Sequence, residues 1–445
     1  MDNNQIRSII TRFFSWEKPV SYHEMDILLC FGCLLRLKMA NQVKFLSDAL
    51  FFPRPTTTEL KDKALRTLQQ TDYKLHKLVV SHLPFSPETK EEERIWDTAI
   101  HLFQVLEQRQ CLNGQEDVAL AFRELLYALS ESSSPLAEST TPRDIVSLIS
   151  TLIQNDSSAS QKERAAILDP ACGTGGFLSQ ALHTLHNSSR SPDFRLSAEG
   201  FTNDRKIADL CSVGLSLGGD TSDYSIQRGS PNPPQQQLPA KFSEKFDFVI
   251  SHIPFGNRQE HLHLQAMMQA AAPSASVIAL IPNGVLFRMG QDEHLRHEWI
   301  ENNQLDTLIY LPDNLLYSTR IPVSIIQLKH TREADAPVRL LDLYHGQVMG
   351  KKQSQLGEEL LEEARQALAG RTSSDSRCRF VTRDEIEKND CILTRERYFS
   401  KFYATTNQPQ PIGLPDILAI QTALEDTQRQ LEQYYQRLDR DSGKS

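Results

Sequence analysis

The stretch FDFVISHIPFGN, residues 246–257, places a histidine, a proline-stiffened turn and an aromatic ring directly after an apolar run. The run ends at His252, and Pro254 biases Ile253 toward an extended backbone before Phe255. Polar and aromatic groups follow a buried strand in this way where strand ends carry chemistry. The ring could stack on a planar acceptor, and a neutral imidazole could accept one hydrogen bond.

A second stretch, AAILDPACGTGGFLSQAL at residues 165–182, pairs an acidic residue with a glycine-rich loop. An apolar run ends at Asp169, passes through Gly173 and Gly175, and opens a helical pattern. Glycines allow a ligand to approach the backbone more closely than a Cβ would permit. Because no Gly-Lys-Ser/Thr follows, a nucleoside-type cofactor fits this loop better than a phosphate-binding P-loop does.

The elements that must position these residues alternate between strands and helices. Short β-branched runs separated by helical stretches are AAILD, RLSAEGF, FDFVIS, SVIALI, DTLIYL and PVSIIQLKH. This alternation predicts an α/β fold with a Rossmann-like, mainly parallel sheet covered on both faces.

The rest of the chain is predominantly helical in pattern. We predict an N-terminal all-helical domain at 1–130, a linker at 131–143, the Rossmann-like domain at 144–345, a mixed region at 346–413 and a C-terminal helical extension at 414–445. The segment SESSSPLAESTTPR, rich in serine, threonine and proline, is either a linker or an ordered loop over a site.

The C-terminal extension carries apolar positions at alternating steps of three and four: Ile417, Ile420, Leu424, Thr427, Leu431, Tyr434 and Leu438. This is the a/d pattern of a coiled coil. About three heptads are short for a stable solitary coil, so we expect a partner helix. Packing against its own domain is the alternative.

Composition limits the class of protein. The chain has 445 residues, 39% of them hydrophobic, and a net charge of −9, which disfavours a generally basic nucleic-acid-binding surface but permits a local basic groove. No apolar run is long enough to cross a bilayer, and MDNNQIRSII lacks the features of a signal peptide. Seven scattered cysteines suggest a reducing compartment, so we expect a cytoplasmic protein without membrane contact. Cys30 and Cys33 lie in an apolar helical pattern, where packing is a better interpretation than a metal site.

Taken together, the motifs resemble the modification subunit family of type I restriction–modification systems, which are S-adenosylmethionine-dependent DNA adenine N6-methyltransferases. The motifs that carry the resemblance are STTPRDIVSLI, DPACGTGGFL, LIPNGVLFR, WIENNQLDTLIYLPDNLLYSTRIPVSIIQL and RFVTRDEIEKNDCILTRERYFS, in the family's order over residues 140–400. The resemblance implies DNA as a partner and a specificity-type subunit that docks on the C-terminal helix, with a homodimer as a further alternative. It also implies that Asp169, Gly173 and Gly175 line the methionine part of S-adenosylmethionine, with Thr141 and Pro142 close by.

At the catalytic motif the sequence departs from the family. The family has Asn-Pro-Pro-Phe or Asn-Pro-Pro-Tyr, in which the asparagine oxygen and a backbone carbonyl accept hydrogen bonds from the adenine amino group, and the aromatic residue stacks on a flipped base. Here the matching residues are His252, Ile253, Pro254 and Phe255. The side-chain amide is lost, and we expect the rate to fall on the order of 10²–10³-fold.

Three further departures concern the cofactor and the DNA side. Thr202 replaces the acidic residue that binds the ribose, a loss of about 1–2 kcal/mol, although Asp204 could substitute for it. Ser230 replaces the acidic acceptor for the adenine ring. We therefore expect S-adenosylmethionine binding to be weak or lost. Arg320 stands where the family has glycine, either near the DNA or cofactor, or simply exposed to solvent.

The sequence thus predicts a modification-subunit homologue that binds DNA or a partner assembly, with methylation impaired or lost. The first alternative is an active adenine N6-methyltransferase that uses His252. A third interpretation is methylation of RNA or protein, because Phe255 still suits a planar acceptor.

Overall fold

The computed structural model of the chain describes residues 3–16, 24–42, 55–82, 90–131, 135–156, 163–189, 194–218, 223–229, 242–256, 258–345, 347–349, 354–370 and 377–403. The chain divides into two compact units, Met1–Thr394 and Arg395–Ser445. Helix α16 (Arg395–Tyr403) is the described part of the second unit. The C-terminal heptads that we expect to bind a partner lie outside the described residues.

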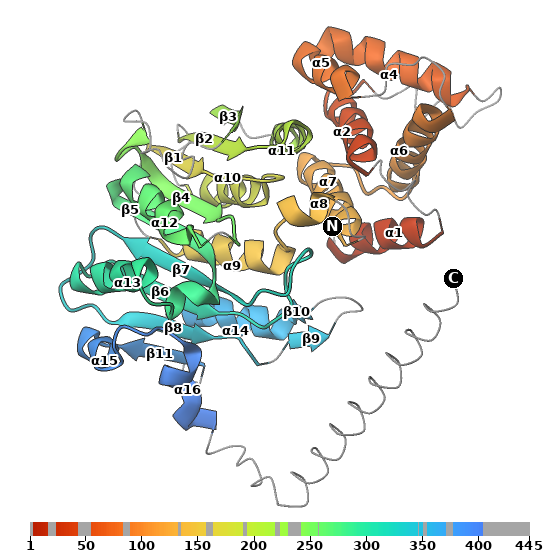
Figure 1. Cartoon of the computed structure of the whole chain (residues 1–445). Coiled ribbons are helices and arrows are strands. Elements are labelled where there is room, and N and C mark those ends of the chain that lie inside the picture. The colour runs from red at the N-terminus through yellow and green to blue at the C-terminus, as the bar shows by residue number, and fades with distance from the viewer. Residues whose placement is uncertain are drawn as a thin grey trace, which may run out of the picture. The chain divides into compact units, whose positions relative to one another are not determined.

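A sheet of nine described strands forms the centre of the first unit. The strands are β1 (Arg164–Asp169), β2 (Arg195–Thr202), β3 (Asp223–Arg228), β4 (Phe246–His252), β5 (Ala271–Pro282), β6 (Leu305–Tyr310), β7 (Val323–Lys329), β8 (Val338–Asp342) and β11 (Cys378–Val381). Their order is β11-β8-β6-β7-β5-β4-β1-β2-β3 (Figure 1). Pairing is antiparallel at β5–β7, β6–β7 and β8–β11 and parallel elsewhere, which confirms the predicted mainly parallel α/β fold.

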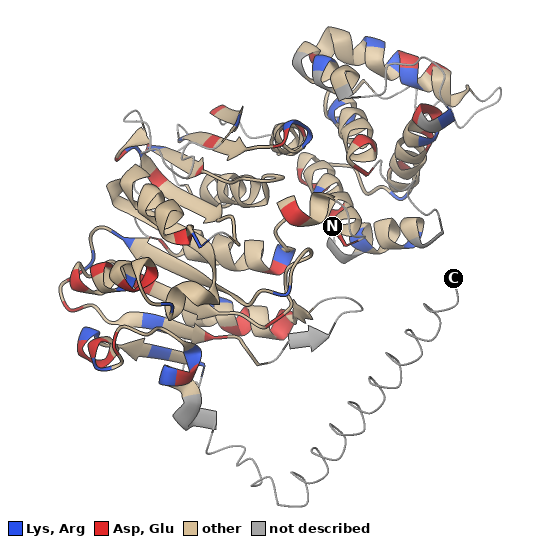
Figure 2. Ribbon diagram, in the orientation of Figure 1, with Lys and Arg blue, Asp and Glu red and all other residues tan. Residues whose placement is uncertain are grey.

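Helices bury the apolar strands. Three helices, α9 (Arg143–Gln154), α10 (Gly176–Ser188) and α14 (Glu358–Leu368), share one core with alternate strand residues such as Ile167, Phe248 and Ile278. Helix α12 (Glu260–Ala270) packs against β4 and β5. Figure 2 shows many charged residues on the outer helices α13 (Gln291–Glu301) and α15 (Arg383–Lys388), whereas the strands are mostly uncharged and carry at most two charged residues each. A two-stranded hairpin, β9 (Gln347–Met349) and β10 (Ser354–Leu356), stands apart from the sheet.

The N-terminal helices form a second core. They are α1 (Asn3–Trp16), α2 (Glu24–Met39), α4 (Thr57–Thr71), α5 (Tyr73–His82), α6 (Lys90–Gln108) and α7 (Gln115–Ser130). Helices α4 and α5 are separated at Asp72, whose carboxylate accepts a hydrogen bond from the Leu75 amide and so caps α5. Cys30 and Cys33 are buried in α2, as the packing interpretation predicts.

Helix α11 (Arg205–Leu217) connects the two cores. Ile207, Leu210, Val213 and Leu217 pack with the N-terminal helices, whereas Cys211 and Leu215 belong to the core under the sheet. Lys206 of α11 also pairs with the buried Asp26 of α2 at 2.9 Å. Helix α11 therefore belongs to both the helical core and the core under the sheet.

The serine-rich segment before α9 is ordered where it is described. It forms the short helix α8 (Pro135–Ser139), with Leu136 and Ala137 buried, and the Ser139 carbonyl accepts a hydrogen bond from the Thr174 amide. Residues 135–141 are therefore ordered, while the linker at 131–143 and the other sequence-based domain boundaries remain predictions. None of the described helices combines the length and apolar composition that a bilayer-spanning segment needs.

Candidate active site

Three parallel strands end at one edge of the sheet and carry predicted site residues there. β1 ends at Asp169, β2 at Thr202 and β4 at His252, and β1 lies between the other two. A cleft of about 750 Å³ opens at this edge. Ligands of open α/β sheets bind at the carboxyl ends of the strands, and the volume suits a nucleoside-sized molecule.

Most of the predicted residues line this cleft. From the predicted cofactor set these are Thr141, Asp169, Gly173, Thr202 and Asp204. The whole predicted catalytic stretch, His252–Phe255, lines it as well. The fold therefore brings together segments that are far apart in the sequence, although their roles remain predictions.

Three predicted residues are placed differently. Pro142 is the residue before α9, and Gly175 is the residue before α10; neither is among the residues that line the cleft. Ser230 lies outside the described residues, directly after Gly229, which does line the cleft.

Two glycines of the loop make room for neighbouring segments of the protein itself. Gly173 has φ +52°, and a Cβ there would lie 2.2 Å from the Ser139 carbonyl oxygen. Gly175 has φ +84°, and its Cβ would lie 2.5 Å from the Cys211 sulfur. The close approach that we expected from a ligand is thus already made by residue 139 on one side and α11 on the other.

Asp169 is buried at the floor of the cleft, with 1% of its surface exposed. Its Oδ1 accepts hydrogen bonds from the Ser251 hydroxyl at 2.9 Å and from the Ala171 amide at 3.0 Å. Burial raises the pKa of Asp169 to about 7, although both hydrogen bonds oppose the rise. A cationic ligand at this position would stabilise the ionised carboxylate.

His252 is partly buried, and its Nδ1 lies 3.1 Å from the Thr141 hydroxyl. Desolvation lowers the pKa of His252 to about 4, so the imidazole is neutral at pH 7. Two tautomers satisfy the contact. If Nδ1–H donates to Thr141, then Nε2 is an acceptor; if the hydroxyl donates to Nδ1, then Nε2 carries the proton and is a donor.

Phe255 packs against this histidine. The two ring centroids are 5.0 Å apart and the ring planes are tilted by 53°. Both rings line the cleft, so one side of the cleft is an aromatic surface next to a single polar nitrogen. This pair could hold a planar group by stacking.

The end of β2 offers a neutral group. Thr202 lines the cleft, and its carbonyl accepts a hydrogen bond from the Gly229 amide at 2.9 Å. Asp204 also lines the cleft, but its Oδ1 caps α11 by accepting from the Ile207 amide at 2.9 Å. Contact with a ribose would therefore compete with an N-cap worth about 1 kcal/mol.

The structure adds cleft residues that the sequence did not single out. Glu138 lines the cleft from α8, His263 from α12, and Thr319 and Ile321 from the segment before β7. The signal for Glu138 was its position three residues before Thr141, but the segment was assigned to a linker. No lysine or arginine lines the described part of the cleft, which therefore suits a cation better than a polyphosphate.

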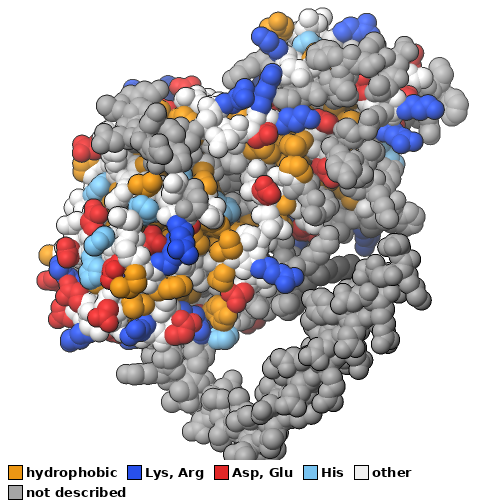
Figure 3. All heavy atoms as spheres, in the orientation of Figure 1, with side chains coloured by type: hydrophobic (Ala, Val, Ile, Leu, Met, Phe, Trp, Pro, Cys, Tyr) orange, Lys and Arg blue, Asp and Glu red, His pale blue; other side chains and the backbone are white. Residues whose placement is uncertain are grey.

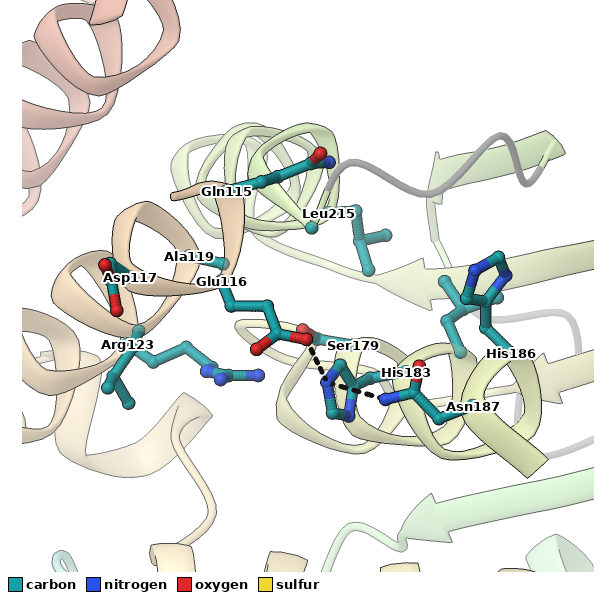
Figure 4. Close-up of a pocket in the computed structure, with 13 residues that line it drawn as sticks. Gln115, Glu116, Asp117, Ala119, Arg123, Ser179, His183, His186, Asn187 and Leu215 are labelled. Carbon is teal, nitrogen blue, oxygen red and sulfur yellow. Dashed lines mark hydrogen bonds and ion pairs between the residues drawn. The ribbon is translucent and has the colours of Figure 1, made fainter. Parts of the chain in front are cut away.

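A second cavity, of about 380 Å³, lies between α7, α10 and α11 and shares no lining residue with the first (Figure 4). Its polar groups contact one another: His183 Nε2 lies 3.1 Å from the Asn187 amide nitrogen and 3.9 Å from Glu116 Oε1. Arg123 also projects into it from α7. Because α10 begins at the glycine loop and these residues lie in its later turns, the cavity is separate from the strand ends.

The family model described as N-6 DNA Methylase matches residues 121–262 and 257–406, more than half of the chain. The chain belongs to this family. The matched residues include the glycine loop, the β4 end and all of the predicted cleft residues. The N6-methyltransferase part of the resemblance is thereby confirmed.

Curated relatives of this N-6 DNA methylase family member confirm the resemblance to type I modification subunits. The chain is 22% identical over 306 residues to the type I restriction enzyme MpnII methylase subunit of Mycoplasma pneumoniae, covering 61% of the chain and 54% of that protein. It thus spans about half the length of the curated relatives it matches.

Two solved structures share its fold. The type I restriction-modification methyltransferase subunit from Streptococcus thermophilus has a TM-score of 0.67 at 15% identity, covering 90% of this chain and 100% of that one. A chain from a study of complex assembly and conformational transition in the type I R-M system has a TM-score of 0.62 at 19% identity, covering 98% and 97%.

Proposed function

We propose that this chain is a type I-like modification-subunit homologue that binds DNA or a partner assembly, and that its adenine N6-methylation is impaired or lost. The observation that carries the proposal is the neutral His252 at the end of β4, with Nδ1 already engaged by Thr141. Only Nε2 remains to meet a substrate amino group.

Adenine N6 is a poor nucleophile because its lone pair is delocalised into the ring. Hydrogen bonds from its two N–H groups to two acceptors would oppose that delocalisation. An asparagine oxygen and a backbone carbonyl supply two such acceptors, whereas here the Ile253 carbonyl is joined by an imidazole that accepts in only one tautomer. Losing one oriented acceptor reduces the rate on the order of 10²–10³-fold.

A second candidate function, an active adenine N6-methyltransferase, is favoured by the same contact. If Thr141 accepts from Nδ1–H, the hydroxyl holds the tautomer in which Nε2 can accept. The low pKa of His252 keeps the ring neutral over the physiological range. Phe255 lines the cleft, where its ring could stack on an adenine.

The cleft fits S-adenosylmethionine in the chemistry of its lining. Carboxylates of Glu138, Asp169 and Asp204 are among the described lining residues, which include no lysine or arginine. Such a lining suits the positively charged sulfonium and ammonium groups of the cofactor. Bound there, S-adenosylmethionine would supply an electrophilic methyl group. Asp169 and Glu138 would hold its cationic end, and Thr202 its ribose. Because Thr202 is neutral and Asp204 caps α11, we expect a Kd of about 100 μM or weaker.

The partners and the location of the protein are part of the same proposal. The heptads within residues 414–445 support docking to a specificity-type subunit, or to a second copy as an alternative. Seven free cysteines support placement in the reducing cytoplasm.

Transfer of labelled methyl groups from S-adenosylmethionine to DNA tests the proposal. The natural protein, purified with its partner subunit, should show activity at least about 10²-fold below an ordinary family member. His252→Asn alone should not restore it, whereas His252→Asn with Thr202→Glu and Ser230→Asp should give measurable transfer that exceeds the sum of the single changes.

The opposite result is equally clear. If the natural protein labels adenine at an ordinary rate and His252→Ala abolishes the labelling, His252 is a working acceptor and the second candidate function is correct.

A further inference from the structure

A short loop beside the cleft is held rigidly but presents apolar side chains to solvent. It runs from Phe287 to Gly290, between β5 and α13. Phe287 is 49% exposed and Met289 is 75% exposed. Between them, Arg288 points inward and pairs with Glu260 at 2.9 Å and Asp292 at 2.7 Å, both buried.

A second arginine fixes the same backbone. Arg296 is only 1% exposed, and its Nη1 donates to the carbonyls of Val285 at 2.8 Å and Arg288 at 2.9 Å. Buried charges are costly to leave unpaired, so these ion pairs and hydrogen bonds favour one conformation of the loop. The exposure of Phe287 and Met289 is therefore a property of a fixed loop.

The loop adjoins the cleft on two sides. The Asn283 amide donates to the Pro322 carbonyl at 2.9 Å, which joins the start of this turn to the segment where Ile321 lines the cleft and is 40% exposed. On the other side, the Arg288–Glu260 pair joins the loop to the start of α12, a few residues after Phe255.

Two exposed arginines stand next in sequence to residues that line the cleft. Arg258 is two residues after Gly256, and Arg320 lies between Thr319 and Ile321. Within the described part of the chain, neither guanidinium has a hydrogen bond or an ion pair. The carboxylates that hold the loop, Glu260 and Asp292, are paired with Arg288 instead. On the face shown in Figure 3, basic side chains are scattered among acidic and hydrophobic ones.

We propose that this rim, defined as Arg258, Phe287, Met289, Arg320 and Ile321, contacts duplex DNA at the mouth of the cleft. The arginines bind phosphates on either side of the nucleotide that enters the cleft, and the fixed apolar side chains press against the bases next to it. Unpaired arginines beside apolar side chains match a duplex, which presents regularly spaced phosphates around stacked bases. The proposal rests on the proposed function and assigns residues to its DNA contact.

The test is binding of a fluorescent duplex to the full chain, followed by anisotropy at several salt concentrations. Arg258→Ala with Arg320→Ala should weaken binding and lower the slope of log K against log salt by about two, one for each phosphate contact. Phe287→Ala with Met289→Ala should weaken binding without changing the slope, because no charge is removed.

Matched controls separate the rim from general surface effects. Arg164→Ala removes an exposed arginine at the opposite end of β1, and Tyr73→Ala removes an exposed aromatic residue from α5. Neither should change the affinity or the slope. Circular dichroism melting should show that all variants fold, since each substituted residue is exposed.

The outcomes distinguish the rim from the proposed function. If the natural chain binds the duplex and both rim variants bind with the same affinity and slope, DNA binding stands and the rim assignment is wrong. If the rim variants instead lose a co-purifying protein while DNA binding is unchanged, the surface is a protein-docking site and the assignment is also wrong. If the natural chain binds no duplex, the DNA part of the proposed function fails together with the rim.

Discussion

At the scale of single residues, burial shifts two titratable groups of the cleft toward their uncharged forms. Burial makes Asp169 partly protonated and His252 neutral. His263, in the same cleft, also has its pKa lowered by burial. The residues that can change charge between pH 6 and 8 therefore include Asp169 but not His252.

This difference predicts how ligand affinity depends on pH. Because folding raises the pKa of Asp169, the protonated carboxyl contributes to folding stability at low pH, and this contribution is lost as the pH rises through about 7. Over the same pH range the carboxylate becomes ionised. A cationic ligand needs the ionised Asp169, so the affinity for S-adenosylmethionine should rise about tenfold between pH 6 and 8. Calorimetric titration at each pH measures this dependence.

Asp169→Asn provides the control, because it removes the titrating group and should leave a weak, nearly flat profile. A natural protein with an equally flat profile would contradict the role of Asp169 in holding the cation.

At the scale of elements, the sequence predicted the strands that end at candidate site residues better than the strands at the β11 edge of the sheet. AAILD and FDFVIS are apolar runs that end in distinctive residues, and they became β1 and β4. β8 and β11 were not predicted as separate strands. β11 is short and places Phe380 in solvent, with 55% of it exposed, so its hydrogen bonds to β8 and not a hydrophobic pattern make it a strand.

The same limit applies to the candidate site. Motifs identified Asp169, Thr202 and His252, since each follows an apolar strand pattern. The contact between Thr141 and His252 joins residues 111 positions apart, and no periodicity reports such a pair. Nor could the sequence show that Asp204 caps a helix, or that residue 139 fills the space above Gly173.

The close contact at Gly173 gives a prediction about the loop. Gly173→Ala combines a left-handed backbone, which costs an alanine roughly 1–2 kcal/mol, with a contact of 2.2 Å against the Ser139 carbonyl. Gly370→Ala meets only the first cost, because Gly370 has φ +72° and an added methyl carbon there would have nothing within 4 Å. We expect Gly173→Ala to lower the free energy of unfolding by clearly more than Gly370→Ala, as measured by urea denaturation.

Equal losses in the two variants would contradict this packing. They would indicate that the segment at residue 139 moves away from the loop at little cost.

At the scale of the whole molecule, the described members of the hydrophobic cores around the sheet and the N-terminal helices are all numbered below 395. Deleting residues 414–445 should therefore leave the melting temperature nearly unchanged while it abolishes co-purification with a partner subunit. Size-exclusion chromatography of the co-expressed proteins and thermal melting measure the two effects. A truncated protein that unfolds would show that the C-terminal helix packs on its own chain.

Helix α11 meets the N-terminal helices through Ile207, Leu210 and Val213 and the core under the sheet through Cys211 and Leu215. An α-helix turns by about 100° per residue, so inserting a single residue near its start would rotate every later side chain out of register with both cores at once. Point changes on one face can be absorbed by repacking, but a change in length cannot. We expect this helix to reject insertions and deletions that the loops on either side of it would accept.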